Sequence, residues 1–360
     1  MSGSKNKSVK PSDAEFLSRA AELAPKGLGH TRPNPAVGAV IVKRGKVIGE
    51  SWHKKAGGDH AEVAAIKNAV RRGESAAGAT IYVTLEPCSK PGRVGACTDA
   101  IIAAGIKRVV YAVADPNPKN RGRARRVLAK HGIECNCYSE QWPKSLCVQQ
   151  ARRLIAPFAK HVLTGLPYVT VKIAMSLDGK ICDDYGSARW ISSAKSRKVT
   201  GRLREQVDAI MVGAETIRKD NPSLLSYGKR NDDLIRVVVT RSGKLPKTAQ
   251  IFTDGAPNKT IVFNTEARRH RGGIKGVLRE LGKMGVMHVL CEGGLKLARS
   301  LADAGLVDEW IAVLAPVVIG SRPIARALRG VMEIMNDDGC CSYVQDAFAF
   351  VNFKQKYFKE

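Results

Sequence analysis

The chain has 360 residues, of which 44% are hydrophobic and 26% are charged. This balance is typical of a globular protein of two domains, and no apolar run approaches the length of a membrane span, so composition argues against a membrane-spanning protein. The 59 basic and 33 acidic residues give a net charge of +26, which favours anionic partners such as phosphorylated metabolites or nucleic acid, or reflects only a well-solvated basic surface.

The N-terminal residues 1–12 are rich in lysine and serine and have no apolar centre. We expect a disordered basic tail there rather than a secretory signal. The nine cysteines are an odd number at irregular spacings, which argues against a disulfide framework and favours the reducing cytoplasm.

The first regular elements are a helix over residues 13–24 and a β-hairpin formed by residues 36–42 and 47–49. Between them, Asn34 stands between two prolines at the entrance of a strand. Its amide is a candidate for holding a substrate, although asparagine between prolines is also a common turn former.

The densest chemistry lies between His60 and Cys97, where His60-Ala61-Glu62 precedes Pro87-Cys88 and Cys97. One histidine and two cysteines can hold a catalytic zinc with its fourth position open. Glu62 is close enough to move protons to and from a zinc-bound hydroxide, and this H-x-E…P-C pattern is typical of zinc deaminases that act on nucleobases. The residues therefore indicate hydrolytic deamination.

The surrounding pattern predicts a helix over 60–70, a strand over 79–85, a helix over 99–104, a strand over 109–114 and a helix over 124–131. Such alternation predicts an α/β sheet with helices on its faces. The basic run 121–126 is interpreted as a solvated helix face. Cys135, Cys137 and Cys147 are interpreted as ordinary thiols, because no further ligand cluster accompanies them.

The domain layout predicted from these patterns is a deaminase domain over 13–150, a linker over 151–167 and a second domain over 168–360. The segment 144–162 is helical in pattern, and we expect Pro157 to break it.

The second half begins anew with strands at 168–175, 209–213, 236–240, 259–263 and 287–291, and helices at 195–205 and 295–304. Glu292-Gly293-Gly294 lies between the last of these strands and a helix. Bare backbone N–H groups at such a helix start can bind a diphosphate, although a Gly-Gly turn is often only a tight connection. The alternating aromatic residues near the C-terminus suggest a closing strand.

The first half resembles the deaminase domain of the bifunctional deaminase-reductases of riboflavin biosynthesis, the RibD family. The matching motifs are Arg32-Pro-Asn-Pro-Ala-Val-Gly38, His53, His60-Ala-Glu62, Thr84-Leu-Glu-Pro-Cys-Ser89, Gly92-Arg93, Cys97 and Asp115-Pro-Asn-Pro118. The spacing from Cys88 to Cys97 is wider than the Cys-x-x-Cys typical of nucleobase deaminases, and this family has the same wider spacing. The chain departs from the family pattern at Lys90-Pro91 and at Val94-Gly95-Ala96.

The resemblance implies zinc-hydroxide deamination of a diaminopyrimidinone that carries a ribosylamino 5'-phosphate. His60, Cys88 and Cys97 would hold Zn²⁺, and Glu62 would be the catalytic proton shuttle. The positions that match substrate-binding ones in the family are Asn34, His53, Arg93, Asp115 and Asn117.

The second half is similar to the riboflavin-pathway reductase domain, whose fold is like that of dihydrofolate reductase. This resemblance implies that NADPH reduces the ribosyl group of the deaminated compound to a ribityl group. The matching substrate and cofactor positions are Lys172, Asp178, Trp190, Gly213, Thr216, Asp220, Glu292, Gly293 and Gly294. Gly201 departs from the family, since many relatives have histidine there.

The sequence therefore predicts a bifunctional riboflavin-biosynthesis enzyme, both hydrolase and oxidoreductase, with a cytidine-deaminase-like α/β/α domain before the reductase domain. The expected partners are the phosphorylated pyrimidine and NADPH, without a membrane, in a homo-oligomer of dimeric or tetrameric form. The alternative is a zinc deaminase that acts on tRNA or another nucleic acid. Against it, no basic stretch is interleaved with aromatic residues for base stacking.

Overall fold

The computed structural model describes residue 10 and residues 12–90, 95–182, 192–226, 234–256, 259–266, 272–319 and 347–352. Two compact units divide the chain, one ending at Leu166 and the other starting at Pro167. No helix among the residues described here is both long and apolar enough to cross a membrane.

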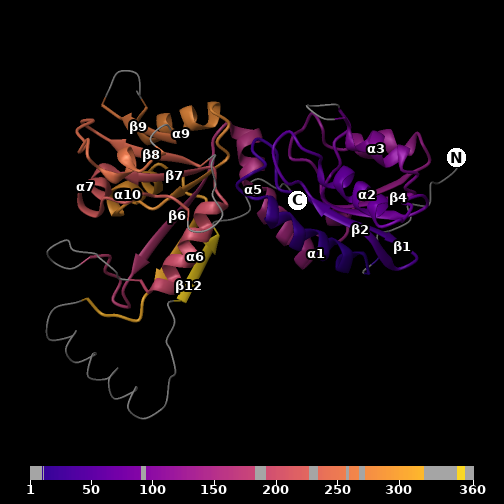
Figure 1. The fold of residues 1–360 in the computed structure, drawn as a ribbon, viewed down its shortest axis with the longest axis horizontal. Coiled ribbons are helices and arrows are strands. Elements are labelled where there is room, and N and C mark those ends of the chain that lie inside the picture. The colour runs from indigo at the N-terminus through magenta and orange to yellow at the C-terminus, as the bar shows by residue number, and fades with distance from the viewer. Residues whose placement is uncertain are drawn as a thin grey trace, which may run out of the picture. The chain divides into compact units, whose positions relative to one another are not determined.

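The first unit contains a sheet whose described strands lie in the order β2-β1-β3-β4-β5 (Figure 1). These strands are β1 (Gly38–Lys43), β2 (Lys46–Trp52), β3 (Thr80–Leu85), β4 (Arg108–Val113) and β5 (Glu134–Cys137). β1 is antiparallel to β2 and β3, whereas β3, β4 and β5 are parallel. The segments that follow β3 and β4 therefore leave the sheet at the same edge.

Helices pack on both faces of this sheet. Successive residues of a strand point to opposite faces, so one strand contributes side chains to the buried clusters on both sides. Ile41 belongs to a buried cluster with Ala65 of α2, whereas Val40 and Val42 belong to another with Leu17 of α1. The helical elements of the unit are α1 (Asp13–Leu23), η1 (Ala24–Gly27), α2 (Ala61–Arg71), α3 (Cys97–Ala103), α4 (Arg123–Ala129), η2 (Tyr138–Glu140) and α5 (Leu146–Thr164).

Helix α5 differs from the expected broken segment and linker. It runs through Pro157 to Thr164, so residues 151–164 are regular helix rather than a connector. Ala151 and Ile155 are one helical turn apart and pack in the same buried cluster as Leu17. Burial of this apolar stripe stabilises the helix across the proline, and the whole of α5 belongs to the first unit.

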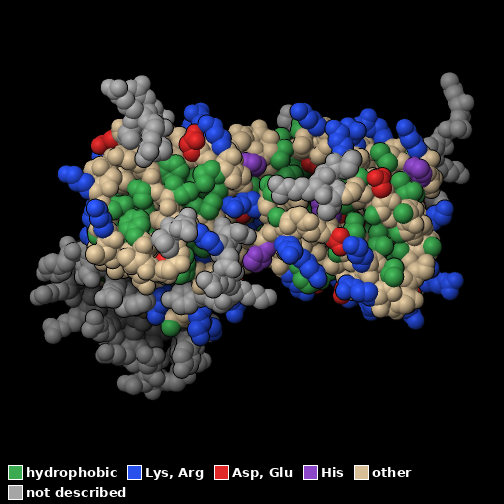
Figure 2. Space-filling model, turned by 45° about the horizontal axis from the view of Figure 1, so that its top comes forward, with side chains coloured by type: hydrophobic (Ala, Val, Ile, Leu, Met, Phe, Trp, Pro, Cys, Tyr) green, Lys and Arg blue, Asp and Glu red, His purple; other side chains and the backbone are tan. Residues whose placement is uncertain are grey.

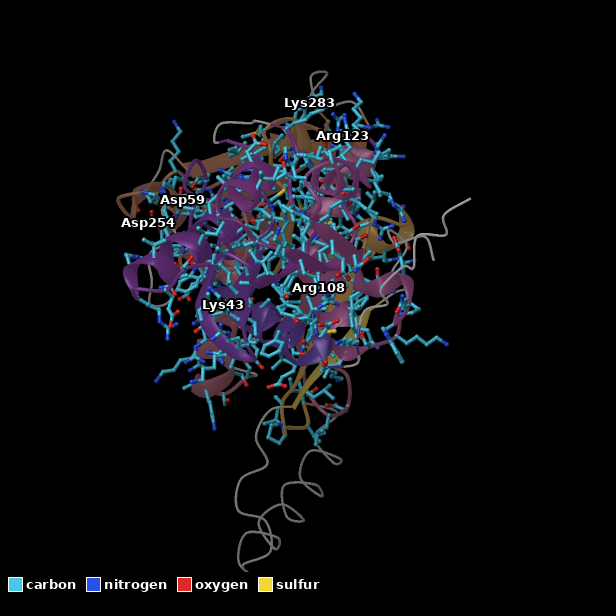
Figure 3. All side chains as sticks on the ribbon, turned by 90° about the vertical axis from the view of Figure 1, so that its right-hand side faces the viewer. Lys43, Asp59, Arg108, Arg123, Asp254 and Lys283 are labelled. Atoms are coloured by element: carbon cyan, nitrogen blue, oxygen red, sulfur yellow. The ribbon has the colours of Figure 1, made fainter. Side chains whose placement is uncertain are left out.

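A buried ion pair supports the amino-terminal edge of the first sheet. Arg108, labelled in Figure 3, donates through Nη2 to Asp13 Oδ2 over 2.8 Å, and the Tyr82 hydroxyl donates to Asp13 Oδ1 over 2.8 Å. Burial alone would raise the pKa of Asp13, but the hydrogen bonds from Arg108, Lys10 and Tyr82 hold it below its usual range. This network joins α1 to β3 and β4.

The second unit contains a sheet in the order β12-β11-β6-β10-β7-β8-β9, with β12 antiparallel to β11 and the remaining neighbours parallel (Figure 1). Its strands are β6 (Tyr168–Met175), β7 (Ala209–Gly213), β8 (Ile235–Thr240), β9 (Thr260–Asn264), β10 (His288–Cys291), β11 (Glu309–Leu314) and β12 (Ala347–Asn352). Its helices are α6 (Ala194–Glu205), α7 (Ala214–Asp220), α8 (Gln250–Thr253), α9 (Gly273–Lys283) and α10 (Leu295–Asp303).

The short strand β5 was not predicted from the sequence. Cys135 and Cys137 lie on β5, with exposed fractions of 6% and 3%. Burial raises the pKa of Cys135 to about 12, so this thiol is protonated and unreactive near neutral pH. These cysteines pack in the core of the first unit.

Candidate active sites

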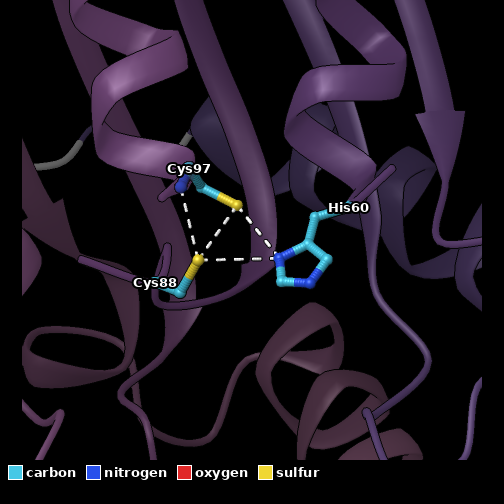
Figure 4. A group of neighbouring side chains, drawn as sticks. All are labelled: His60, Cys88 and Cys97. Atoms are coloured by element: carbon cyan, nitrogen blue, oxygen red, sulfur yellow. Dashed lines mark hydrogen bonds between the residues drawn. The ribbon is translucent and has the colours of Figure 1, made fainter. Parts of the chain in front are cut away.

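Three side chains in the first unit form a cluster suited to a metal ion (Figure 4). His60 is the N-cap of α2, Cys88 follows β3, and Cys97 is the first residue of α3. His60 Nδ1 lies 3.2 Å from Cys97 Sγ and 3.6 Å from Cys88 Sγ, and the two sulfur atoms are 3.3 Å apart. The fold thus brings together side chains that are up to 37 residues apart.

Cys88 is the acidic thiol of the cluster, whereas the hydrogen bond with Cys88 raises the pKa of Cys97 well above its ordinary value. The hydrogen bond between the two cysteines, assisted by His60, lowers the pKa of Cys88 to about 4, so its sulfur is a thiolate at neutral pH. The backbone N–H of Cys97 also donates to Cys88 Sγ over 3.3 Å. Thiolate sulfur and imidazole nitrogen are ligands that zinc prefers, and three of them leave a fourth position for water. The donor set therefore fits zinc.

Glu62 lies beside this cluster and is 4% exposed. Burial, followed by the negative charge of Cys88, raises its pKa to about 7. A carboxyl group with such a pKa can take up and release a proton near neutral pH, as general acid–base catalysis requires.

Asn34 and His53 extend the site on the side of His60. The His53 ring is 5.2 Å from the His60 ring and is 2% exposed. Its Nδ1 lies 2.9 Å from the Asp59 carbonyl oxygen, which can only accept, so Nδ1 carries the proton. Nε2 is then the acceptor for the Asn34 amide at 3.3 Å. Burial lowers the pKa of His53, which keeps the ring neutral.

Asp115 and Asn117 lie on the loop after β4. Asp115 is 7% exposed, and burial raises its pKa, with smaller contributions from the charges of Glu86 and Cys88. Asp115 Oδ1 accepts from the Asn117 N–H over 2.8 Å, and Oδ2 accepts from Asn120 Nδ2 over 3.2 Å. The carboxylate therefore braces its own loop. Arg93 lies outside the described residues.

In the second unit, Glu292 follows β10 and is paired with a residue that the sequence pattern did not single out. Arg204 of α6 donates from Nε and Nη2 to the two Glu292 carboxylate oxygens over 2.7 and 3.0 Å. Burial alone would raise the pKa of Glu292, but Arg204 and the nearby Lys172 charge hold it below its usual range. In the sequence, Arg204 appears only as one of several basic residues of a predicted helix. That pattern does not indicate which residue it pairs with.

Lys172 lies on β6, and burial lowers its pKa, while the charge of Glu292 opposes this shift. Two cations and one carboxylate therefore meet near the carboxyl end of β10, beside the middle of β6. A partly buried lysine in a site with this surplus of positive charge is suited to an anionic or oxygen-rich ligand.

The glycine positions form two adjoining loops. Gly213 is the N-cap of α7 and Gly294 is the N-cap of α10, and they follow β7 and β10, which are neighbouring parallel strands. A Cβ atom on Gly293 would lie 2.8 Å from Leu297 Cδ2 and 3.4 Å from the Gly213 nitrogen. Two helix starts with bare N–H groups at one sheet edge fit the diphosphate of a dinucleotide such as NADPH.

The remaining reductase positions are less closely tied to a site. Thr216 and Asp220 lie on α7. Asp178 Oδ1 accepts from the Ile319 N–H over 3.1 Å, which fastens the turn after β6 to the segment after β11. Trp190 lies outside the described residues.

Comparison with known families agrees with this division. The RibD C-terminal domain matches residues 167–347, and the cytidine and deoxycytidylate deaminase zinc-binding region matches residues 10–113. The riboflavin biosynthesis proteins RibD of Aquifex aeolicus and Escherichia coli are 37% and 36% identical over 327 and 338 residues. Those alignments cover 87% and 86% of this chain and 89% of each relative.

Solved structures give the same result for the fold. RibD of Acinetobacter baumannii in form 1 is 35% identical with a TM-score of 0.76. A Thermotoga maritima diaminohydroxyphosphoribosylaminopyrimidine deaminase/5-amino-6-(5-phosphoribosylamino)uracil reductase is 36% identical with a TM-score of 0.77. Each covers 86% of this chain and 88% of the solved chain. The predicted fold, a cytidine-deaminase-like unit before a dihydrofolate-reductase-like unit, is confirmed, and the chain belongs to the RibD family of riboflavin-biosynthesis proteins.

Proposed function

We propose that this chain is a bifunctional enzyme that catalyses two consecutive steps of riboflavin biosynthesis. The first step removes an exocyclic amine from a diaminopyrimidinone ribosylamino 5'-phosphate, and the second uses NADPH to reduce the ribosyl group to ribityl. This proposal rests on the cluster of His60, Cys88 and Cys97 beside Glu62. The second unit of the same chain matches the RibD C-terminal domain.

In the deaminase step, His60, Cys88 and Cys97 would hold zinc. When bound, zinc activates water for attack on the ring carbon that carries the amine. Glu62 accepts a proton from that water and returns it to the departing amine, which leaves as ammonia. Burial raises the pKa of Glu62, which suits a group that both accepts and returns a proton.

The Asn34 and His53 pair would orient the pyrimidine. Because Asn34 donates its amide hydrogen to His53 Nε2, the orientation of the Asn34 carbonyl oxygen is fixed as an acceptor. A pyrimidine amine or ring N–H is a suitable donor for it. Asp115 and Asn117 would contact the substrate from the opposite loop, and Arg93 would contact its phosphate.

In the reductase step, NADPH supplies the hydride when bound. Gly213, Gly293 and Gly294 would receive its diphosphate, and Lys172 would orient the opened ribose. Glu292 would hold a ribose hydroxyl, because Arg204 keeps its carboxylate ionised and fixed in direction. Asp178, Trp190, Thr216 and Asp220 stay predictions as further substrate or cofactor contacts.

The strongly basic composition is compatible with this function. On the face shown in Figure 2, Lys and Arg side chains are spread over both units rather than gathered into one stripe. A phosphorylated substrate and NADPH are both anionic, so a dispersed positive field would draw them to either unit. A nucleic-acid groove would require a continuous basic track with stacking residues.

The deciding experiment is a mass-resolved assay of the diaminopyrimidinone substrate with and without NADPH. Substrate alone should release ammonia and give the deaminated ribosyl compound, and added NADPH should convert that compound to the ribityl product. Ammonia release without any later NADPH oxidation would contradict the bifunctional assignment.

Two further expectations belong to this proposal. All seven cysteines among the described residues are free, which supports a cytoplasmic location. A homo-oligomer, dimer or tetramer, is expected from family resemblance, and sedimentation of the purified protein measures it.

A further inference from the structure

Glu86 lies between β3 and Cys88, and the sequence pattern gave it no role beyond its place in a motif. Its exposed fraction is 4%. A carboxylate removed from water in this way is costly unless hydrogen-bond donors surround it. The partners of Glu86 therefore indicate what the residue does.

Three backbone N–H groups donate to the Glu86 carboxylate. Oε2 accepts from Asp115 over 3.2 Å and from Gly122 over 3.0 Å, and Oε1 accepts from Ala124 over 3.2 Å. The N–H of Glu86 itself donates to the Val113 carbonyl over 3.0 Å. One side chain thus bridges the end of β4 and the first turn of α4.

These donors stand at both ends of the loop that carries Asp115 and Asn117. Gly122 is the N-cap of α4 with φ of 73°, so the chain turns there into the helix. Within the loop, Asp115 accepts from Asn117 and Asn120. Glu86 therefore fastens the two ends of the loop, and Asp115 braces its middle.

The same segment also carries a metal-site residue. Cys88 is two residues after Glu86, and its carbonyl oxygen accepts from the Thr98 N–H over 3.1 Å at the start of α3. A rigid connection runs from the cysteine cluster through Glu86 to the Asp115 loop. Substrate groups held by the loop are then kept at a set position relative to the cluster, as catalysis by orientation requires.

We propose that Glu86 is a positioning residue of the deaminase site, which fixes the 115–122 loop against the Cys88 segment so that the loop can bind substrate. This inference rests on the proposed deaminase function. Glu86 touches neither substrate nor metal in this role, and its effect passes through the backbone of the loop.

The test is Glu86→Gln in the full-length protein. Glutamine keeps the size of the side chain, but its NH₂ group cannot accept a hydrogen bond, so at least one loop N–H loses its acceptor. We expect the KM for the diaminopyrimidinone substrate to rise roughly 10–100-fold, with a smaller change in kcat. Zinc content and NADPH oxidation with supplied deaminated intermediate should stay at wild-type levels.

Hydrogen exchange followed by mass spectrometry gives an independent readout. In Glu86→Gln, peptides that cover residues 114–124 should exchange faster, while peptides from β1 should be unchanged. The matched control is Glu140→Gln, because Glu140 also pairs with α4, through Arg125 at 2.9 Å, but on the exposed surface. This control should leave KM and loop exchange unaltered.

An unchanged KM in Glu86→Gln, or loss of zinc together with activity, would overturn the proposal. If Glu86→Gln does not fold, Glu86→Asp decides, since it keeps the charge but shortens the reach to the loop. A raised KM with retained zinc supports the proposal, and a wild-type KM overturns it. Failure of wild-type protein to release ammonia would instead contradict the proposed function itself.

Discussion

The two units differ in where one ion pair lies relative to the candidate site. In the first unit, the Arg108 and Asp13 pair lies at the amino-terminal edge of the sheet, whereas His60, Cys88 and Cys97 gather at the other end of β3. In the second unit, the buried Arg204 and Glu292 pair lies within the candidate site itself. A second buried pair of that unit, Arg236 with Asp254, includes none of the candidate site residues. The contrast between the units therefore concerns the Arg204 and Glu292 pair, which contributes to the site as well as to the fold.

The difference follows from what each site must supply. The deaminase site must activate water and transfer protons, so it uses thiolate sulfur and a carboxyl group with a pKa of about 7. The reductase site receives its reactive hydride from NADPH, and its residues mainly orient and polarise. Fixed charges such as Glu292 and Arg204 suit that task.

The largest expected effect comes from removing a metal-site residue. Cys97→Ala should lose both zinc and ammonia release, because two protein ligands hold zinc much less tightly than three. NADPH oxidation with supplied deaminated intermediate should persist. Metal analysis and the two separate assays measure this, with Cys135→Ala as the buried-thiol control. Loss of both activities in Cys97→Ala would show that the units are not functionally separable.

A somewhat smaller effect is expected for Glu62→Gln. Glutamine cannot carry the proton, so ammonia release should fall by about 10²–10⁴-fold. Zinc content should remain near one per chain, and reduction should be unaffected. Zinc analysis beside both assays checks the separation, and reduced metal content would assign Glu62 to support of the cluster.

In the second unit, Arg204→Met tests whether the ion pair of Arg204 with Glu292 contributes both to stability and to the reductase site. Removal of the arginine leaves Lys172 as the cation that acts on the buried Glu292 charge among the described residues. This loss should destabilise the unit by about 3 kcal/mol. NADPH oxidation should also fall, whereas ammonia release should not. Hydrogen exchange by unit and the two assays measure these effects. Arg202→Met, on the exposed face of α6, is the control, and equal behaviour of the two variants would refute the shared role.

The smallest effect concerns acid stability of the first unit. Because the pKa of Asp13 is lower in the folded protein than its ordinary 3.8, its ionisation stabilises the fold above about pH 4, and this contribution is lost as pH falls through the folded pKa. Wild type should therefore lose more stability than Asp13→Asn as the pH falls from about 5 to about 2.5. Exchange rates of peptides from α1 measure the difference, and parallel pH curves would contradict it.

Local patterns predicted the regular elements well where apolar spacing was strong. The strands 168–175 and 209–213 were placed with the bounds that the structure has. The helix predicted over 144–162 is confirmed as α5, but the break expected at Pro157 is wrong. Proline disfavours a helix interior locally, while burial of Ile155 against the core outweighs that preference. Short elements such as β5 carry too few residues for a clear period.

The sequence by itself determined which residues could perform chemistry: a histidine, two cysteines and a glutamate at telling spacings, followed by glycine loops after buried strands. Tertiary structure alone decided their partners, because contacts such as Arg204 with Glu292, 88 residues apart, depend on the order of strands in a sheet. Local periodicity does not encode that order. The same holds for Glu86, whose carboxylate meets its loop only because β3 and β4 lie side by side.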